Sequence, residues 1–333
     1  MKAFLLDRYG KTGNTRIGDA PEPPMGDGDV LVRIHAASVN PLDLKIRDGD
    51  FKLILPYRLP LILGNDLAGV VEKVGAKVTR FQPGDAVYAR PDKARIGTFA
   101  ELIAIDEADV ARKPANVTME EAASLPLVGL TAWQALIERG KLQPGQTVLI
   151  HAGSGGVGAF AIQLAKHLGA TVATTTSTAN VEWVKRLGAD IVIDYKKEKF
   201  QDVLRDVDVV LNTLGPDTLE QSLQVMKPGG RLISISGPPD PAFARDAGLS
   251  WPLVQVMRLL SRRIRSRAKQ RGVEYSFLFM RPDGAQLQQI AALVEAGTIQ
   301  PVVDKVFPFE ATQDALAYVE TGRAKGKVVI KLV

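Results

Sequence analysis

The chain has 333 residues, of which 46% are hydrophobic and 24% charged, so it has room for two domains and is not disordered, collagen-like or disulfide-stapled. Cysteine is absent, which excludes a thiol nucleophile, a thiol redox couple and a thiolate metal site. The net charge of +5 invites a nucleic-acid partner, but seven basic residues lie within 258–271. Without these seven, 35 of the 42 Lys and Arg residues remain, against 37 Asp and Glu residues. The basic excess is therefore confined to one segment, and no nucleic-acid partner is expected.

The first third of the chain shows short strands separated by turn residues. Its opening, MKAFLLDRYG, carries Asp7 and Arg8 before a signal-peptide apolar stretch could form, so we expect a cytoplasmic protein. The spacing of the strands is typical of a small β-rich domain. They are predicted at 29–38, 67–75, 83–89 and 97–105.

From about residue 118 the pattern changes to apolar strands alternating with helices, which predicts a parallel, doubly wound sheet. The uncharged window 142–165 could cross a bilayer by length alone, but its glycines and polar residues indicate strand, loop and helix, so no transmembrane segment is expected. The predicted strands are 147–151, 171–175, 190–194, 208–213 and 231–236, with helices at 156–168, 179–187 and 216–226.

The strongest chemical signal is a glycine-rich loop in TVLIHAGSGGVGAFAIQLAKHLGA, where the spacing is GxGxxG between a strand and a helix. The first glycine permits a tight turn, the second lets a pyrophosphate approach the backbone, and the third lets the helix pack closely on the strand. Phosphate then binds the N–H groups at the start of the helix. The predicted dinucleotide-binding residues are Gly153, Ser154, Gly155, Gly156, Val157 and Gly158.

The end of the second strand distinguishes NAD from NADP. An acid about 20 residues past the loop would bind the ribose 2′-OH of NAD, but none occurs between Gly158 and Glu182. Thr175, Thr176 and Ser177 stand there and can donate to a 2′-phosphate, so we expect NADP(H). The alternative is that these hydroxyls only cap the next helix.

A breaker after Gly237 precedes a helix predicted from Trp251 to about Gln270, which carries the seven basic residues. We interpret it as a solvated cover over the active site. The alternative is an amphipathic surface helix, because apolar residues from Trp251 to Leu260 precede the basic ones. Beyond it, strands are predicted at 275–280, 303–308 and 325–333, with helices at 284–296 and 310–321.

Several segments together resemble the medium-chain dehydrogenase/reductase superfamily. In order along nearly the whole chain they are SVNPLDLKIRDG, LGNDLAGVV, PGDAVYA, GLTAW, HAGSGGVG, LGADIVIDY, MKPGGRLI and GKVVI. The resemblance implies an α/β protein in which a GroES-like β-rich catalytic domain is interrupted by a Rossmann domain with a doubly wound parallel sheet. We expect the first part at 1–122, the Rossmann domain at 123–265, and a completing C-terminal segment at 266–333.

The ligands of the zinc-dependent members are missing from this sequence. The turn that carries the family's ligating histidine reads Gly64-Asn65-Asp66, and the first-ligand region reads Ser38-Val39-Asn40. His35, His151 and His167 fall on separate predicted elements, whereas catalytic zinc needs three convergent ligands. No metal is expected, and the chain resembles the zinc-independent quinone oxidoreductases and 2-alkenal or enone reductases.

Such a reductase transfers a hydride to the β-carbon of an enone and needs donors for the oxygen that becomes an enolate. Asn40, Lys45 and Tyr57 are the candidate catalytic residues. Their alternative roles are a turn-stabilising Asn, a solvated Lys and a surface aromatic. Strand ends and the resemblance add further cofactor contacts. These are Thr131, Tyr195, Asn212, Thr213, Leu214, Ser236, Phe277, Leu278, Phe279, Lys325 and Lys327.

The sequence therefore predicts an NADPH-dependent, zinc-independent reductase of quinones or of the C=C bond of α,β-unsaturated carbonyls, acting as a monomer or homodimer on a small molecule. The alternative is a cofactor-binding protein with little turnover, whose basic helix docks on an anionic membrane or nucleic acid. The sequence fits a metal-free alcohol dehydrogenase poorly, because it offers neither a Lewis acid nor an evident general base for alcohol oxidation.

Overall fold

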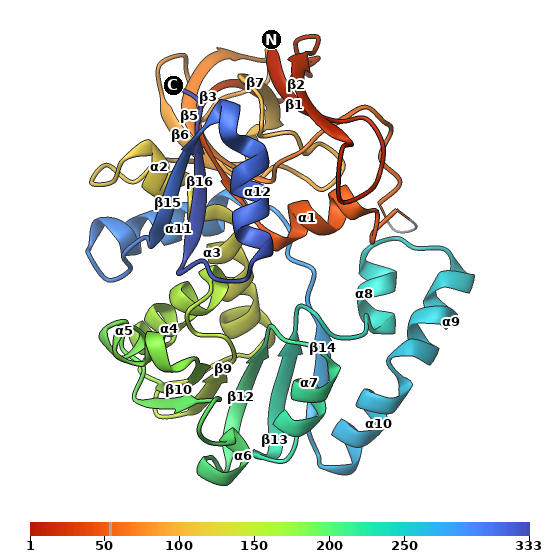
Figure 1. Ribbon diagram of the computed structural model, residues 1–333, viewed down its shortest axis with the longest axis vertical. Helices are drawn as coiled ribbons and strands as arrows, with labels where there is room; N and C mark the ends of the chain where they lie inside the picture. The colour runs from red at the N-terminus through yellow and green to blue at the C-terminus, as the bar shows by residue number, and fades with distance from the viewer. Residues whose placement is uncertain (53–54) are drawn as a thin grey trace. The chain divides into compact units, whose positions relative to one another are not determined.

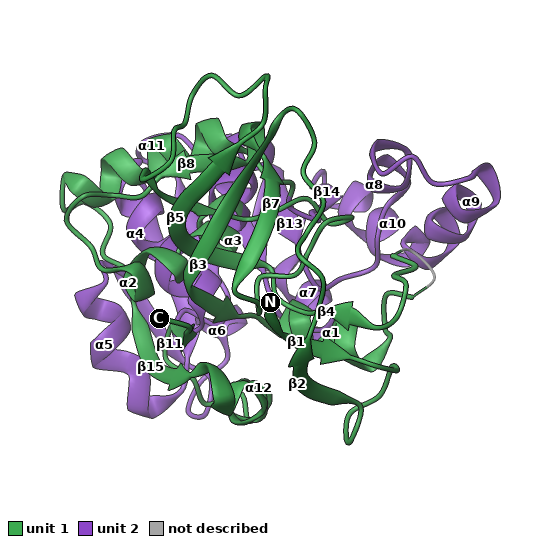
Figure 2. Cartoon of the chain, turned by 90° about the horizontal axis from the view of Figure 1, so that it is seen from above, with its two compact units in different colours: residues 1–130, 281–333 green, residues 131–280 purple. Residues whose placement is uncertain are grey.

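The computed structural model describes residues 1–52 and 55–333, which divide into two compact units. The first comprises Met1–Leu130 and Arg281–Val333, and the second comprises Thr131–Met280 (Figure 2). These divisions differ from the boundaries expected at 122 and 265. The second differs more, because β14 (Glu274–Phe277) pairs in parallel with β13 (Met226–Ser234) and so belongs to the sheet of the second unit.

In its described residues, the first unit holds a seven-stranded sheet with the order β15-β16-β3-β5-β6-β8, in which β7 also pairs with β3 (Figure 1). The apolar run DVLVRIHAASV makes β3 the central strand, with most of its residues buried. The strands are β3 (Asp29–Val39), β5 (Asp66–Val74), β6 (Ala86–Ala89), β7 (Leu102–Asp106), β8 (Val110–Arg112), β15 (Val303–Pro308) and β16 (Lys327–Lys331).

A smaller antiparallel sheet in the same unit has the order β2-β1-β4, with bounds Thr15–Asp19, Lys2–Leu6 and Leu61–Ile62. The core lies between the sheets and helices and contains Phe4, Ile34, Leu67, Phe99 and Ile330. The helices of this unit are α1 (Pro41–Asp48), α2 (Met119–Ala123), α11 (Gly284–Glu295) and α12 (Thr312–Glu320).

Local sequence explains why α1 begins directly after the central strand. Pro41 occupies the first helical position, and the Asp43 side chain accepts a hydrogen bond from the Asn40 backbone N–H, which completes a capping box. The helix ends at Gly49, whose φ of 85° favours glycine. From the other side, β16 runs antiparallel to β3 and pairs Val328 with Val39. Residues 40 and 327 therefore meet at the end of β3.

The second unit contains a six-stranded parallel sheet with the order β11-β10-β9-β12-β13-β14. Numbered from β9, this order is 3-2-1-4-5-6, that of a dinucleotide-binding Rossmann sheet. Its core includes Leu149, Ala173, Val210 and Leu232. The GroES-like and Rossmann fold classes predicted from sequence are both confirmed. The other strands are β9 (Thr147–Ile150), β10 (Thr171–Thr176), β11 (Ile191–Asp194) and β12 (Val207–Asn212).

The helix predicted from residue 251 to 270 is two helices, α9 (Trp251–Leu260) and α10 (Arg262–Gln270), which meet at Ser261. Among the described residues, none of the helices has the length and apolar composition needed to cross a bilayer. The remaining helices are α3 (Pro126–Trp133), which continues into the π-helical turn Gln134–Arg139, α4 (Gly156–His167), α5 (Val181–Arg186), α6 (Phe200–Val203), α7 (Pro216–Ser222) and α8 (Pro241–Asp246).

Candidate active site

The glycine-rich loop joins β9 to α4, and each of its three glycines has a different steric reason to be there. A Cβ at Gly153 would overlap the Thr174 hydroxyl of the neighbouring strand, and one at Gly158 would overlap the carbonyl oxygen of Ala152. A Cβ at Gly155 would meet only that same oxygen, at 3.5 Å. The loop is therefore packed tightly on its inner side and is open at Gly155, which caps the start of α4.

The tight turn itself is made one residue earlier than the spacing suggested. Ala152 has a φ of 52°, in the left-handed region, while Gly153 is kept small by the close approach of β10. The first N–H groups of a helix have no acceptor within it, so the amides at the start of α4 are available to a phosphate. Ser154, Gly156 and Val157 lie on this same loop and first turn.

The strand order reverses between β9 and β12, and the residues that follow these two strands meet there. Thr213 Oγ1 donates to the carbonyl oxygen of His151 at 3.1 Å, which ties the two loops together. Asn212 Oδ1 accepts from Ser234 Oγ at 3.1 Å, whereas Asn212 Nδ2 is buried with no acceptor among the described residues. Leu214 is partly exposed, and Ser236 Oγ donates to its carbonyl oxygen.

The end of β10 differs from what the sequence predicted for cofactor selection. Thr175 is buried, and its hydroxyl accepts from Ala152 N at 3.2 Å and lies 3.1 Å from His151 Nδ1. Burial lowers the pKa of His151 to about 3, so the ring is neutral, and its Nε2 lies 2.9 Å from Ser222 Oγ. Ser222 Oγ donates to Thr218 O at 2.7 Å, so the neutral His151 ring carries its proton on Nε2, and Nδ1 accepts from Thr175. The Thr175 hydroxyl is therefore used within the protein and has no proton left for a 2′-phosphate.

The other two hydroxyl groups at this strand end have different surroundings. Thr176 Oγ1 is buried without a hydrogen-bond partner in the described part of the chain, and Ser177 is half-buried. Tyr195 is 62% exposed, and its backbone N–H donates to Thr176 O at 3.1 Å, which places it at the same edge. Lys196 follows it and is exposed. Lys196 is not among the cofactor contacts predicted from the sequence, although basic residues follow LGADIVIDY.

The residues of this edge fit a nicotinamide dinucleotide. The open face at Gly155 can admit a pyrophosphate. Thr176 Oγ1 and Asn212 Nδ2 are buried without a hydrogen-bond partner among the described residues, and a bound ligand would supply one. The other predicted contacts of this unit are less accessible. Thr131 and Leu278 are buried, and Phe277 and Phe279 pack against Phe243 with ring centroids 5.1 and 6.1 Å away.

The first unit contains a buried group of polar side chains at the end of β3, which we call the polar cluster. Asp66 is its centre: Oδ2 accepts from Ser38 Oγ at 2.7 Å and from Asn40 Nδ2 at 2.9 Å, and Oδ1 accepts from Leu127 N at 2.7 Å. Asp43 Oδ1 accepts from Asn65 Nδ2 at 2.7 Å. The cluster comprises Ser38, Asn40, Asp43, Asn65, Asp66, Arg90 and Lys327.

Two cations complete the polar cluster. Lys327 is only 5% exposed, and its ammonium donates to Asn40 Oδ1 and Val39 O, 3.4 Å from Asp66 Oδ2. Burial lowers the pKa of Lys327, and the nearby Asp66 carboxylate opposes that shift. Burial also lowers the pKa of Arg90, whose Nη2 donates to Asn65 Oδ1 at 3.5 Å. The polar cluster thus holds two buried carboxyl groups, of Asp43 and Asp66, and two buried cations, Lys327 and Arg90. Charged groups are seldom buried in a low-dielectric interior unless opposite charges and hydrogen bonds compensate them.

The structure brings together Asn40 and Lys327, which the sequence placed in different roles. Both amide hydrogens of Asn40 are engaged, by Asp66 and by Ser38 O at 3.3 Å, and the side chain is buried. Asn40 therefore lacks the free amide expected of a substrate donor. Lys325, by contrast, is exposed.

The remaining two catalytic candidates lie in different settings. Tyr57 is half-buried, and its hydroxyl donates to Lys93 O at 2.7 Å. Burial raises its pKa well above the usual value; the Arg90 charge opposes that shift and Asp43 adds to it. Lys45 is exposed, with its ammonium 6.0 Å from the centroid of the Phe51 ring. In residues 1–52 and 55–333, no three His, Cys, Asp or Glu side chains are grouped to hold a metal ion.

Comparisons with known proteins agree with this architecture. Residues 26–115 match the family model "Alcohol dehydrogenase GroES-like domain" and residues 187–330 match "Zinc-binding dehydrogenase". The chain is 32% identical over 359 residues to the zebrafish (Danio rerio) NAD(P)H oxidoreductase RTN4IP1, mitochondrial, covering 100% of this chain and 92% of the relative. It is 35% identical over 341 residues to the Arabidopsis thaliana NADPH-dependent alkenal/one oxidoreductase, chloroplastic, covering 99% and 79%.

The solved structure of a quinone oxidoreductase from Coxiella burnetii superposes with a TM-score of 0.88 at 31% identity, covering 100% of this chain and 99% of that one. The chain belongs to the medium-chain dehydrogenase/reductase superfamily, as its sequence motifs indicated. It is an oxidoreductase that uses a nicotinamide cofactor.

Proposed function

We propose that this protein is an NADPH-dependent, zinc-independent reductase that transfers a hydride to the C=C bond of α,β-unsaturated carbonyls or to quinones. The observation that carries the proposal is the open glycine loop at the reversal point of the parallel sheet, with the buried orphan groups of Thr176 and Asn212 beside it. The names of the Arabidopsis and Coxiella proteins support the two substrate classes.

Our assignment of NADPH rests on the edge formed by Ser177, Tyr195 and Lys196. No acid stands between Gly158 and Glu182, and Lys196 supplies an exposed cation beside Tyr195. Asp194 lies opposite Thr176, but its carboxylate accepts from Thr178 Oγ1 at 2.6 Å and lies 3.6 Å from Lys197 Nζ. The name of the Arabidopsis relative includes NADPH. Thr175 plays no part in this assignment, because its hydroxyl is committed to His151 and Ala152.

When bound, the nicotinamide would supply the hydride, and conjugation in the substrate spreads the developing charge onto the carbonyl oxygen. We assign Tyr57 as the donor to that oxygen. Its raised pKa keeps the hydroxyl protonated, so it can exchange the Lys93 carbonyl for the substrate oxygen without losing its proton. Water supplies the proton that the α-carbon gains. Lys45 is a second, exposed donor, and Asn40 positions Asp66 and Lys327 rather than touching substrate.

The test is NADPH oxidation by purified protein with 2-alkenals, cyclic enones, 1,4-quinones and simple ketones, with and without a chelator. We expect turnover of enones or quinones that the chelator does not change. Turnover confined to ketones, or abolished by the chelator, would refute the proposal. A cytoplasmic location and a monomeric or dimeric state stay predictions from the sequence.

A further inference from the structure

Helix α9 is apolar on two opposite faces, only one of which is covered. Val254 and Met257 are buried in the second unit. On the other side Trp251 is 73% exposed, Leu259 70%, Leu260 57% and Val256 48%. A helix that is apolar all round is normally buried, and a contiguous exposed apolar patch marks an interaction site. Four large apolar side chains within ten residues are more than scattered surface hydrophobics.

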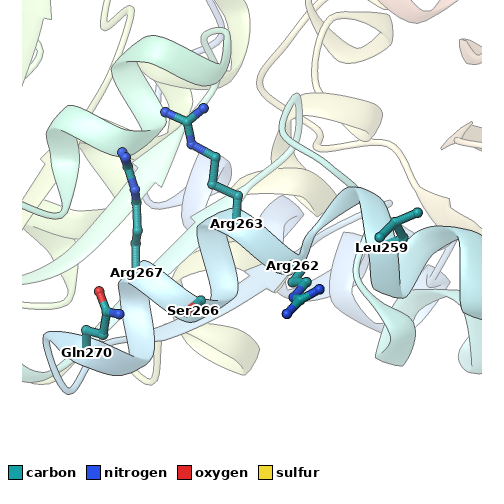
Figure 3. A pocket seen from close by; sticks show the side chains of 6 residues that line it. All are labelled: Leu259, Arg262, Arg263, Ser266, Arg267 and Gln270. Carbon is teal, nitrogen blue, oxygen red and sulfur yellow. The ribbon is translucent and has the colours of Figure 1, made fainter.

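Helix α10 follows immediately and is strongly basic. Ile264 and Ala268 hold it against the second unit, and it has no acidic residue. Arg263 and Arg267 both pair with Glu220 of α7, and Figure 3 shows them pointing to the same side of the helix. The other five basic residues of 258–271 have no ion pair among the described residues: Arg258, Arg262, Arg265, Lys269 and Arg271, the last of which donates to Leu223 O at 3.2 Å.

The apolar and basic surfaces are continuous. Backbone hydrogen bonds from Ser261 N to Met257 O and from Arg265 N to Ser261 O carry the helical turn from α9 into α10. An open hollow of about 490 Å³ joins the two, lined by Leu259 at its apolar end and by side chains of α10 along the rest (Figure 3). The lining residues on α10 are Arg262, Arg263, Ser266, Arg267 and Gln270.

We propose that the pair α9–α10 docks this enzyme on the surface of an anionic lipid bilayer. Trp251, Leu259 and Leu260 would enter the boundary between headgroups and acyl chains, and the unpaired cations would lie against lipid phosphates. Helices that lie at the surface of a bilayer have the same composition: tryptophan and leucine, here on α9, enter the bilayer, and arginine, here mainly on α10, contacts the headgroups. The hollow, with guanidinium groups beside Leu259, suits a phosphate attached to an acyl chain.

Two other occupants fit the surface less well. A nucleic acid would use the cations and could stack a base on Trp251, but it has no use for the exposed Val256, Leu259 and Leu260. A second copy packed symmetrically would bring together two acid-free stretches at 258–271, and like charges repel. Docking on a bilayer does not depend on the proposed reaction, although it would place the enzyme where lipophilic enones and quinones dissolve.

The test is flotation of the full-length protein with phosphatidylcholine vesicles containing 30% phosphatidylglycerol or none, at about 0.05 and 0.5 M salt. We expect binding to the anionic vesicles alone, weakened by salt. Arg262→Glu with Arg265→Glu should reduce partitioning about 30-fold or more, and Leu259→Gln with Leu260→Gln should reduce it even at low salt. The matched control, Lys11→Glu with Lys73→Glu, makes the same charge change at exposed lysines of the first unit and should leave binding unchanged.

Turnover of a water-soluble enone should be the same in all these variants, which separates loss of docking from loss of fold or of the proposed activity. Equal binding to neutral vesicles, or equal loss in the control, would overturn the proposal. So would retention on a short RNA without binding to vesicles, or a dimer in solution that only the Leu259 and Leu260 variant dissociates.

Discussion

Asn40 Nδ2 donates to Asp66 Oδ2 at 2.9 Å, and this contact links the residue that caps α1 to the first residue of β5. The ammonium of Lys327 completes the arrangement by donating to Asn40 Oδ1. In the zinc-dependent relatives that the sequence resembles, these loops carry metal ligands. Here a lysine from the C-terminal strand supplies the positive charge among them.

Removing that charge should be costly. Lys327→Met leaves Asp43 and Asp66 buried with one cation fewer, so we expect the free energy of unfolding to fall by about 3 kcal/mol. Urea unfolding measures this. Lys325→Met is the matched control, because Lys325 is exposed and should change stability by less than about 0.5 kcal/mol. Equal stability of the two variants would mean that Lys327 is not charged in the folded protein.

Asp43 predicts a specific pH dependence. Burial raises its pKa to about 6, above the value near 3.9 of an unfolded chain. Between these values the folded state binds the proton more tightly, so its stabilising contribution is full below about pH 4 and is lost as the pH rises through 6. Measured against Asp43→Asn, the wild type should gain about 2 to 3 kcal/mol in unfolding free energy from pH 7 to pH 4. A difference that is flat with pH contradicts this.

Substitutions at the three loop glycines should have different effects: two should lower stability, and the third should abolish NADPH binding. Gly153→Ala and Gly158→Ala place a Cβ against Thr174 and Ala152, so each should lower stability by about 1 to 3 kcal/mol. At Gly155 a Cβ meets no atom closer than the Ala152 carbonyl oxygen, at 3.5 Å, so Gly155→Val should lose NADPH binding while costing only the smaller stability change of a poorer N-cap. Thermal unfolding and cofactor fluorescence together separate the two effects. Retained NADPH affinity in Gly155→Val would show that the phosphates bind elsewhere.

Cofactor preference should respond at Ser177. Ser177→Asp introduces a carboxylate at the half-buried strand end and should raise the KM for NADPH about tenfold or more, with little effect on NADH. Ser177→Asn is the neutral control of similar size. Thr175→Asp would instead bury a charge beside His151 and destabilise the fold. If Asp and Asn at position 177 act alike, the 2′-phosphate does not lie at this edge.

Tyr57→Phe tests the enolate donor. Losing a hydrogen bond made mainly in the transition state should lower kcat by up to about 10²-fold and leave NADPH affinity unchanged. Tyr9→Phe is a suitable control, because, among the described residues, the Tyr9 hydroxyl donates only to the Tyr57 carbonyl, at 3.4 Å. A kcat within twofold of wild type would remove Tyr57 from the mechanism and leave Lys45 as the donor.

Local patterns in the sequence predicted much of the second unit. The GxGxxG spacing and the alternation of apolar strands and helices depend on backbone conformation and on periods of two and 3.6 residues, which neighbouring residues determine. The strands from β9 to β12 and the helix α4 were therefore located to within one residue, whereas β13 begins at residue 226, five residues before the predicted strand. The break at Ser261 was missed, since nothing in the adjacent residues signals it.

Tertiary structure decided the rest, because it depends on contacts between distant residues. The sequence could place hydroxyl groups at the end of β10, but only packing against His151 turned Thr175 inward. Lys327 and Asn40 meet because β16 pairs with β3, a register set by burial of both strands and not by either segment alone. Side-chain direction and long-range pairing are properties of the packed core, whereas the motif, the missing cysteines and the basic stretch were readable in the chain itself.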